Sequence, residues 1–264
     1  MLINLQQSIN GLSNWIEKNG YAGWDPYDIK GLDISLKIQQ LGDKNLFGKI
    51  IRKGYFSFTD LFPNVSRKLL NVRPLENAKG IGLVLTSYSK LYKITQNEVY
   101  LEKALKYANW LDKNRCKSYI GYNWGYPFDW QSAIFIPRGT PSSVVTYTVG
   151  NGFYELYKVT NDKKYLDICI GICEFFTKEL NITYEDDNRI CHSYTPIDDY
   201  QVHNANLFVG EFLVKIGKKT NNEEWISRGV KCANFAISQQ QKKGFIPYWG
   251  LEQTNKYSNG KDRN

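Results

Sequence analysis

The chain has 264 residues, of which 42% are hydrophobic and 15% aromatic, and its formal net charge is +8. This composition is typical of a globular protein, and the length suits a single domain, residues 1–264. The lysines are spread along predicted helices rather than gathered in a patch, which argues against a nucleic-acid partner, and no apolar run approaches the roughly 20 residues needed for membrane insertion.

The first 75 residues are predicted to form irregular helices. These helices span residues 3–18, 28–41, 44–60 and 64–72. Gly54 and Pro63 are expected to break the last two, because both residues disfavour a continuous helix. We interpret residues 1–75 as degenerate helical hairpins.

The same helical hairpin is then predicted three times. Its turn recurs at Thr95-Gln96-Asn97, Thr160-Asn161-Asp162 and Thr220-Asn221-Asn222, with apolar residues at helical spacing on both sides. Thr, Asn and Asp supply turn and N-cap side chains at such positions. We predict repeats at 76–115, 141–180 and 200–241, and therefore an all-α array of hairpins.

The repeats are joined by long connections, residues 114–141 and 180–200. In an up-and-down array these connections meet at one end, which we call the long-loop end. Long structured connections in a compact domain are usually functional. We therefore predict the functional residues at this end.

Aromatic residues are unusually frequent in the predicted loops of the long-loop end. Aromatic faces beside carboxylates and amides suit pyranose rings, because the C–H face of a sugar packs on a ring. The alternative is that these rings only cover the end of the core. The predicted substrate-binding aromatic residues are Trp24, Trp124, Tyr126, Trp130, Tyr248 and Trp249.

Three carboxylates are the candidate catalytic groups. Asp129 lies between Phe128 and Trp130, and apolar surroundings raise a carboxyl pKa and suit a general acid. Asp25 or Asp28 would supply the second carboxylate, because glycoside hydrolysis uses two carboxylates on opposite sides of the scissile bond.

Polar residues near the starts of the inner helices complete the candidate site. His203 is a further catalytic candidate, and Glu76, Arg138 and Asn204 are candidates for substrate binding. His203 and Arg138 would orient or bind an anionic sugar. The alternatives are a structural hydrogen bond for His203 and interaction with the helix dipole for Glu76.

No metal or cofactor is predicted. Cys191-His192 with His203 resembles part of a zinc cluster, but no second Cys lies at metal-ligand spacing. Gly-rich phosphate loops and dinucleotide fingerprints are absent. The odd count of five cysteines and the lack of a signal-peptide pattern indicate reduced thiols and a cytoplasmic location.

Four motifs carry a resemblance to a known family. They are Gly23-Trp24-Asp25-Pro26-Tyr27-Asp28, Trp124-Gly125-Tyr126-Pro127-Phe128-Asp129-Trp130, Thr140-Pro141-Ser142-Ser143-Val144-Val145 and Val202-His203-Asn204-Ala205-Asn206-Leu207. The chain resembles, over about residues 20 to 260, a poorly characterised polysaccharide-biosynthesis-associated family of the six-hairpin glycosidase-like superfamily. The resemblance implies an (α/α)6-like toroid and a carbohydrate-related role. Such relatives continue into further helices, so we expect a toroid that is incomplete at the C-terminus.

Together these features predict a carbohydrate-active protein of surface or exopolysaccharide biosynthesis. If it is catalytic, it would hydrolyse, eliminate or epimerise a sugar of an oligosaccharide or polysaccharide precursor. The alternative is a non-catalytic glycan-binding or scaffold subunit that works with glycan-biosynthesis proteins. A third hypothesis is a solenoid-like array for protein–protein contacts, which would be an open superhelix with a broad concave face and no central pocket.

Overall fold

The computed structural model describes residues 2–253 of the chain, and its secondary structure there is mainly helical. The helices are α1 (Leu2–Asn19), α2 (Asp33–Lys44), α3 (Leu46–Leu61), α4 (Pro63–Leu69), α5 (Ala78–Thr95), α6 (Glu98–Lys113), α7 (Ser143–Thr160), α8 (Lys163–Lys178), α9 (His203–Thr220) and α10 (Glu223–Ser238). The all-α prediction is therefore confirmed.

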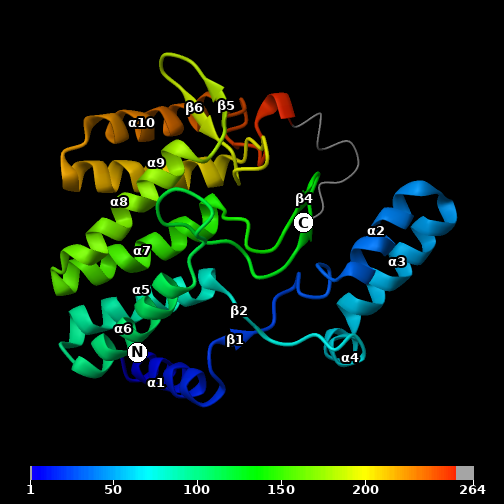
Figure 1. Ribbon diagram of the computed structural model, residues 1–264, viewed down its shortest axis with the longest axis horizontal. Coiled ribbons are helices and arrows are strands. Elements are labelled where there is room, and N and C mark those ends of the chain that lie inside the picture. The colour runs from blue at the N-terminus through cyan, green and yellow to red at the C-terminus, as the bar shows by residue number, and fades with distance from the viewer. Residues whose placement is uncertain (1, 254–264) are drawn as a thin grey trace.

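The pairs α5–α6, α7–α8 and α9–α10 are the predicted repeats, and their turns share one geometry. The inner helix of each pair ends on a left-handed residue, namely Gln96 (φ 54°), Asn161 (φ 53°) and Asn221 (φ 54°). The side chain of the next residue, Asn97, Asp162 or Asn222, accepts a hydrogen bond from the first turn of the following helix. The three short turns lie on one side of the molecule and the long connections lead to the other (Figure 1).

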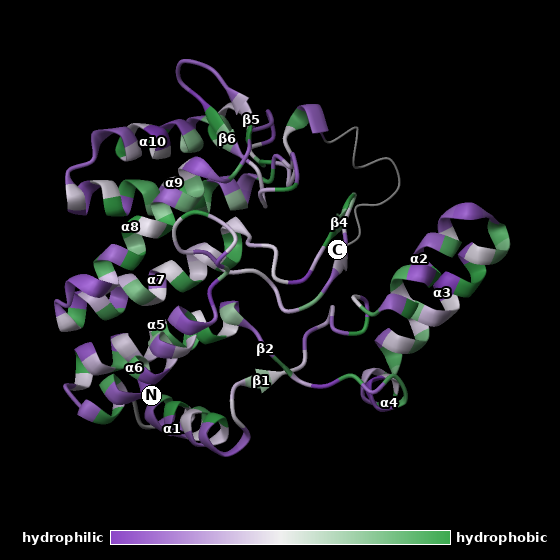
Figure 2. Cartoon of the chain, viewed as in Figure 1, coloured by the Kyte–Doolittle hydropathy of each residue, from purple (hydrophilic) through white to green (hydrophobic). Residues whose placement is uncertain are grey.

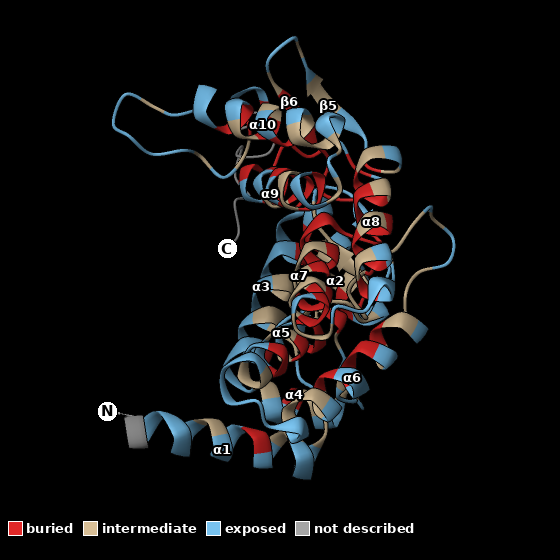
Figure 3. Ribbon diagram, turned by 90° about the vertical axis from the view of Figure 1, so that its left-hand side faces the viewer, coloured by how far each residue is buried: buried red, intermediate tan, exposed pale blue. Residues whose placement is uncertain are grey.

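The core lies where the repeats stack. The inner helices α5, α7 and α9 pack in sequence, each against the next, and buried residues concentrate along them and along α8 (Figure 3). Close approach needs small residues: a Cβ at Gly229 on α10 would lie 2.4 Å from the carbonyl oxygen of Gly210 on α9. Helix α1 packs against the first repeat, where the Ser13 hydroxyl lies 3.0 Å from the hydroxyl of Tyr88.

Short antiparallel strand pairs, which the helical patterns did not predict, organise the long connections. The strands are β1 (Ala22–Gly23) with β2 (Leu75–Glu76), β3 (Trp130–Gln131) with β4 (Phe135–Ile136), and β5 (Ile182–Glu185) with β6 (Ile190–His192). The register pairs Ala22 with Glu76, which brings the first loop beside the start of α5. The strands therefore fix loops that the sequence leaves without a periodic signal.

Helices α2, α3 and α4 form an arm that projects away from the repeats (Figure 1). The helices of the arm contain hydrophobic as well as hydrophilic residues (Figure 2), and Leu46, Phe47 and Ile50 of α3 are each more than 60% exposed. The expectation that Gly54 breaks the helix is wrong, since α3 passes through it. Pro63 does separate two helices, because it occupies the first turn of α4, where its missing N–H costs no hydrogen bond.

Within residues 2–253 no helix combines the length and the apolar character that a membrane crossing requires. Residues 251–253, which follow the last long helix, are helical, and residues 254–264 lie outside the described part.

Candidate functional site

The long-loop end carries a continuous row of aromatic rings drawn from three separate loops. Tyr27 stacks on Phe128 with centroids 6.0 Å apart, and Phe128 stacks on Tyr126 at 5.3 Å. Trp130 continues the row, 5.9 Å from Tyr126 and 5.7 Å from Tyr194. We call these five residues the aromatic row. It joins the N-terminal loop to the connections before α7 and α9.

The aromatic row also presents phenolic hydroxyls. The Tyr126 and Tyr194 oxygens lie 3.5 Å apart. Burial raises the pKa of Tyr194 well above its ordinary value, and the nearby Tyr126 hydroxyl adds to the rise. The Tyr194 phenol is therefore neutral at physiological pH and able to donate a hydrogen bond.

Asp129 is held inside its own loop. One carboxylate oxygen, Oδ1, accepts a hydrogen bond of 2.6 Å from the backbone N–H of Arg138. Its carbonyl oxygen packs against Gly31, where an added Cβ would lie only 2.2 Å away. Asp129 thus connects its loop to the base of the arm, and the Arg138 side chain is exposed nearby.

Asp25 and Asp28 lie in one turn and do not face each other across a cleft. Asp28 is 5% exposed and accepts two hydrogen bonds from the Arg67 guanidinium, 2.9 Å from Nε and 3.4 Å from Nη2. Asp25 accepts from the backbone N–H of Tyr27 at 2.9 Å and from the side-chain amide of Asn77 at 3.4 Å. Asp28 is therefore the partner of a buried ion pair, a role that the sequence analysis did not foresee.

The predicted polar residues lie at the starts of inner helices. Glu76 precedes α5 and accepts a hydrogen bond of 3.1 Å from the indole of Trp110. His203 begins α9, is 4% exposed and packs its ring 5.5 Å from that of Phe235. Burial lowers the pKa of His203, so its ring is neutral at pH 7. Asn204 follows on the exposed side of the same turn.

The structure buries Trp124 fully and Trp249 partly, although both were predicted to contact the ligand. Trp124 is 1% exposed, and its indole N–H donates to the carbonyl of Leu111 at 2.8 Å, so it belongs to the core and the predicted contact with a ligand is wrong. Trp249 packs edge-on against Tyr200, with centroids 5.2 Å apart, and is half-buried. Tyr248 beside it is exposed and remains accessible.

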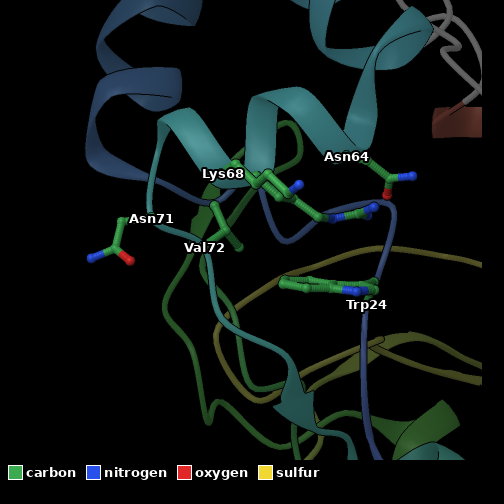
Figure 4. A pocket seen from close by; sticks show the side chains of 6 residues that line it. Trp24, Asn64, Lys68, Asn71 and Val72 are labelled. Atoms are coloured by element: carbon green, nitrogen blue, oxygen red, sulfur yellow. The ribbon is translucent and has the colours of Figure 1, made fainter.

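Trp24 lies in a pocket that the sequence analysis did not locate. The pocket has a volume of about 560 Å³ and is lined by Trp24, Asn64, Arg67, Lys68, Asn71 and Val72. Trp24 forms one wall and the residues of α4 and its C-terminal end form the other (Figure 4). The Arg67 guanidinium lies over the indole of Trp24, 4.9 Å from the ring centroid, while the same guanidinium binds Asp28. The Asp28–Arg67 pair therefore fixes the Trp24 loop against α4.

The residues of α4 were missed because their partners are distant in sequence. Arg67 and Asp28 are 39 residues apart, and no periodic pattern connects them. The segment 64–72 contains two adjacent basic residues, Arg67 and Lys68, but such a pair alone does not indicate a site.

The cysteine and histidine residues near β6 are buried. All five cysteines are free thiols, and burial raises the pKa of Cys191 to about 12. Burial, with a smaller contribution from nearby Arg228, lowers the pKa of His192 to about 3. Within the described part of the chain, no three His, Cys, Asp or Glu side chains are grouped as a metal site would require.

The sequence matches no protein-family model and no curated protein, but the fold is similar to that of solved structures. A cellobiose 2-epimerase from Bacillus thermoamylovorans has a TM-score of 0.51 at 12% identity, over 67% of this chain and 50% of that one. A D-mannose isomerase has a TM-score of 0.51 at 14% identity, over 66% and 46%. A GH76 α-mannanase from Bacteroides thetaiotaomicron has a TM-score of 0.50 at 18% identity, over 66% and 45%.

The chain thus spans about half the length of each of these structures. At these sequence identities the similarity concerns the fold alone. The fold of this chain is of the (α/α) toroid type, built from helical hairpins.

Proposed function

We propose that the chain is a carbohydrate-active protein of surface-polysaccharide or exopolysaccharide biosynthesis, which works in the cytoplasm and binds its saccharide at the long-loop end. The observation that carries this proposal is the pocket between Trp24 and α4. Trp24, its aromatic wall, is 47% exposed, and two residues with side-chain amides, Asn64 and Asn71, are among those that line the pocket. An indole face with neighbouring amides suits the C–H face and the hydroxyls of a pyranose.

The fold supports the same proposal in a general way. The similar structures are named as a sugar epimerase, a sugar isomerase and a mannanase. A shared fold does not transfer a reaction, because function resides in the site rather than in the scaffold. The argument for this chain therefore rests on the side chains of the long-loop end.

In the catalytic form of the proposal, the chain hydrolyses, eliminates or epimerises a sugar. Asp129 and Asp25 are then the paired carboxylates, since Asp28 already forms an ion pair with Arg67. The exposed Arg138 and Tyr248 would contact the sugar. His203 would act as a neutral group, because its burial disfavours the charged form.

A second candidate function is a non-catalytic glycan-binding or scaffold subunit that works with glycan-biosynthesis proteins. One observation favours it: each candidate carboxylate already accepts hydrogen bonds from the chain itself, Asp129 from the Arg138 N–H, Asp25 from the Tyr27 N–H and Asp28 from Arg67. Carboxylates that hold loops together in this way suit a binding surface better than proton transfer.

The test is a screen of the protein against defined oligosaccharides with mass-spectrometric readout of products, together with a binding measurement on the same panel. Products of new mass, or isomers of unchanged mass separated by chromatography before the mass spectrometer, that disappear in Asp129→Asn would support the catalytic form. Binding without any product would support the glycan-binding subunit. If no oligosaccharide is bound or converted, the proposed function is wrong.

A further inference from the structure

We propose that the pocket between Trp24 and α4 selects an acidic saccharide, a pyranose carrying a carboxylate or phosphate group, through the ammonium group of Lys68. This inference rests on the proposed function, because it assumes a saccharide and names its chemical class. The sequence analysis predicted that Arg138 and His203 bind the anionic group of the sugar; this inference assigns that role to Lys68 of α4 instead.

The charges of the pocket are the first argument. Both charged residues that line it, Arg67 and Lys68, are cationic, and no Asp or Glu lines it. The Arg67 charge is compensated by Asp28, which is buried behind it. Lys68 forms no ion pair within residues 2–253, and its side chain is exposed at the pocket. The pocket therefore retains one cationic group that is available to a ligand.

The polar lining is the second argument. The side-chain amides of Asn64 and Asn71 form no hydrogen bonds within the described part of the chain; the Asn64 amide lies on the Trp24 side of the pocket, where it can bind hydroxyl groups, and the Asn71 amide lies at the far end (Figure 4). The backbone of Asn71 is held at φ +51° after the end of α4, where the N–H of Val72 donates to the carbonyl of Arg67 at 2.9 Å. Because this hydrogen bond closes the end of α4, the backbone position from which the Asn71 side chain extends is fixed.

The indole of Trp24 is the third argument. Its ring lies opposite α4 (Figure 4), and Arg67 covers part of it at 4.9 Å. The side chain of Val72 adds an apolar contact to the same pocket. A pyranose placed beside Arg67 would pack on the indole, with its hydroxyls toward the Asn64 amide and its anionic substituent toward Lys68 (Figure 4).

The experiment compares matched neutral and acidic probes by titration calorimetry. The probes are β-linked disaccharides ending in glucose, galactose or mannose, each paired with the corresponding uronic acid, together with glucose 6-phosphate and inorganic phosphate. We expect an acidic probe to bind about fivefold more tightly than its neutral counterpart at low salt, which is the upper range for an exposed ion pair. The preference should shrink as salt screens the charge.

Variants assign the preference to Lys68. Lys68→Ala should bind the acidic and neutral probes equally, and Lys68→Arg should keep the preference. Lys53→Ala is the matched control, because Lys53 is an exposed arm lysine outside the pocket, and it should behave like the wild type. Trp24→Ala should weaken the binding of the acidic and the neutral probe about tenfold each, since it removes the aromatic face on which the sugar packs.

The outcomes separate this inference from the proposed function. If neutral and acidic probes bind equally and both depend on Trp24, the proposed function stands and the acidic preference is wrong. A preference that survives in Lys68→Ala would also overturn it. If inorganic phosphate competes as well as glucose 6-phosphate, the pocket recognises an anion alone and not a saccharide. If no probe binds, both proposals fail.

Discussion

Removal of the Arg67 guanidinium should release the Trp24 loop from α4. The Asp28 side chain is 2% exposed and the Arg67 side chain 13%, so Arg67→Met leaves a buried carboxylate without its counter-ion. Loss of one partner from such a pair costs about 3–5 kcal/mol. Because the helices α2–α4 of the arm pack mainly against one another, we expect this cost to appear as local opening and not as unfolding of the repeats.

Hydrogen exchange measured by mass spectrometry tests this prediction. A tenfold change in an equilibrium constant corresponds to about 1.4 kcal/mol, so a cost of about 3 kcal/mol predicts roughly 100-fold faster amide exchange. We expect it in the segment 25–31, where the amide of Gly31 donates to the carbonyl of Tyr27 at 2.9 Å. Exchange in α5–α10 should be unchanged. Addition of Asp28→Asn to Arg67→Met should restore part of the protection, because the double variant no longer buries an unpaired charge.

Arg52→Met is the matched control on the same arm. Arg52 pairs with Asp43 at 2.7 Å, but the Asp43 side chain is 49% exposed, so its loss should cost less than about 1 kcal/mol. If Arg67→Met accelerates exchange no more than Arg52→Met does, the Asp28–Arg67 pair does not hold the pocket together and the reasoning is refuted.

Three further predictions concern residues of the candidate site and the core. Asp129→Asn keeps an oxygen acceptor for the N–H of Arg138, so Tm should stay nearly constant while any turnover of the true glycan is abolished; a large fall in Tm would make Asp129 purely structural. Trp124→Ala should lower the free energy of unfolding by about 3–5 kcal/mol in urea titrations, as for other buried aromatic residues, and a fully stable variant with weakened glycan binding would contradict its place in the core. The pKa of His192 falls from 6.5 to about 3 on burial, so the unfolded state binds more protons and stability is lost as the pH falls from about 6.5 toward 3. Between pH 6.5 and pH 5 this loss should be about 2 kcal/mol, and His192→Gln should flatten it; an unchanged pH profile in that variant would show that other groups cause the loss.

The repeats could be predicted because their signals are local. The turns at Thr95, Thr160 and Thr220 place a left-handed residue and an N-cap within a few positions of each other, so helical spacing and turn chemistry agree without reference to the rest of the chain. The prediction that Gly54 breaks a helix was wrong because it, too, used local signals alone. A single Gly costs a helix only about 1 kcal/mol, and the contact between α3 and α2 outweighs this cost.

The site could be predicted only in part, because burial and pairing are set by contacts between distant segments. Trp124 and Trp130 look alike in sequence, yet Trp124 reaches into the core while Trp130 joins the aromatic row. The motif that includes Trp24 and Asp28 indicated a site, but the partner residue Arg67 comes from α4. A single sequence carries no signal for such a pairing, so the wall of the pocket that α4 supplies had to come from the structure.

The central claim is that a saccharide binds on the indole of Trp24, and the indole N–H signals in nuclear magnetic resonance spectra test it most directly. Trp24 is 47% exposed in the pocket, whereas Trp124 is 1% exposed and donates its indole N–H to Leu111. Titration with the tightest oligosaccharide of the panel should shift the Trp24 signal, identified from the spectrum of Trp24→Phe, and leave the Trp124 signal in place. A saccharide that binds without any shift of the Trp24 signal would contradict the account.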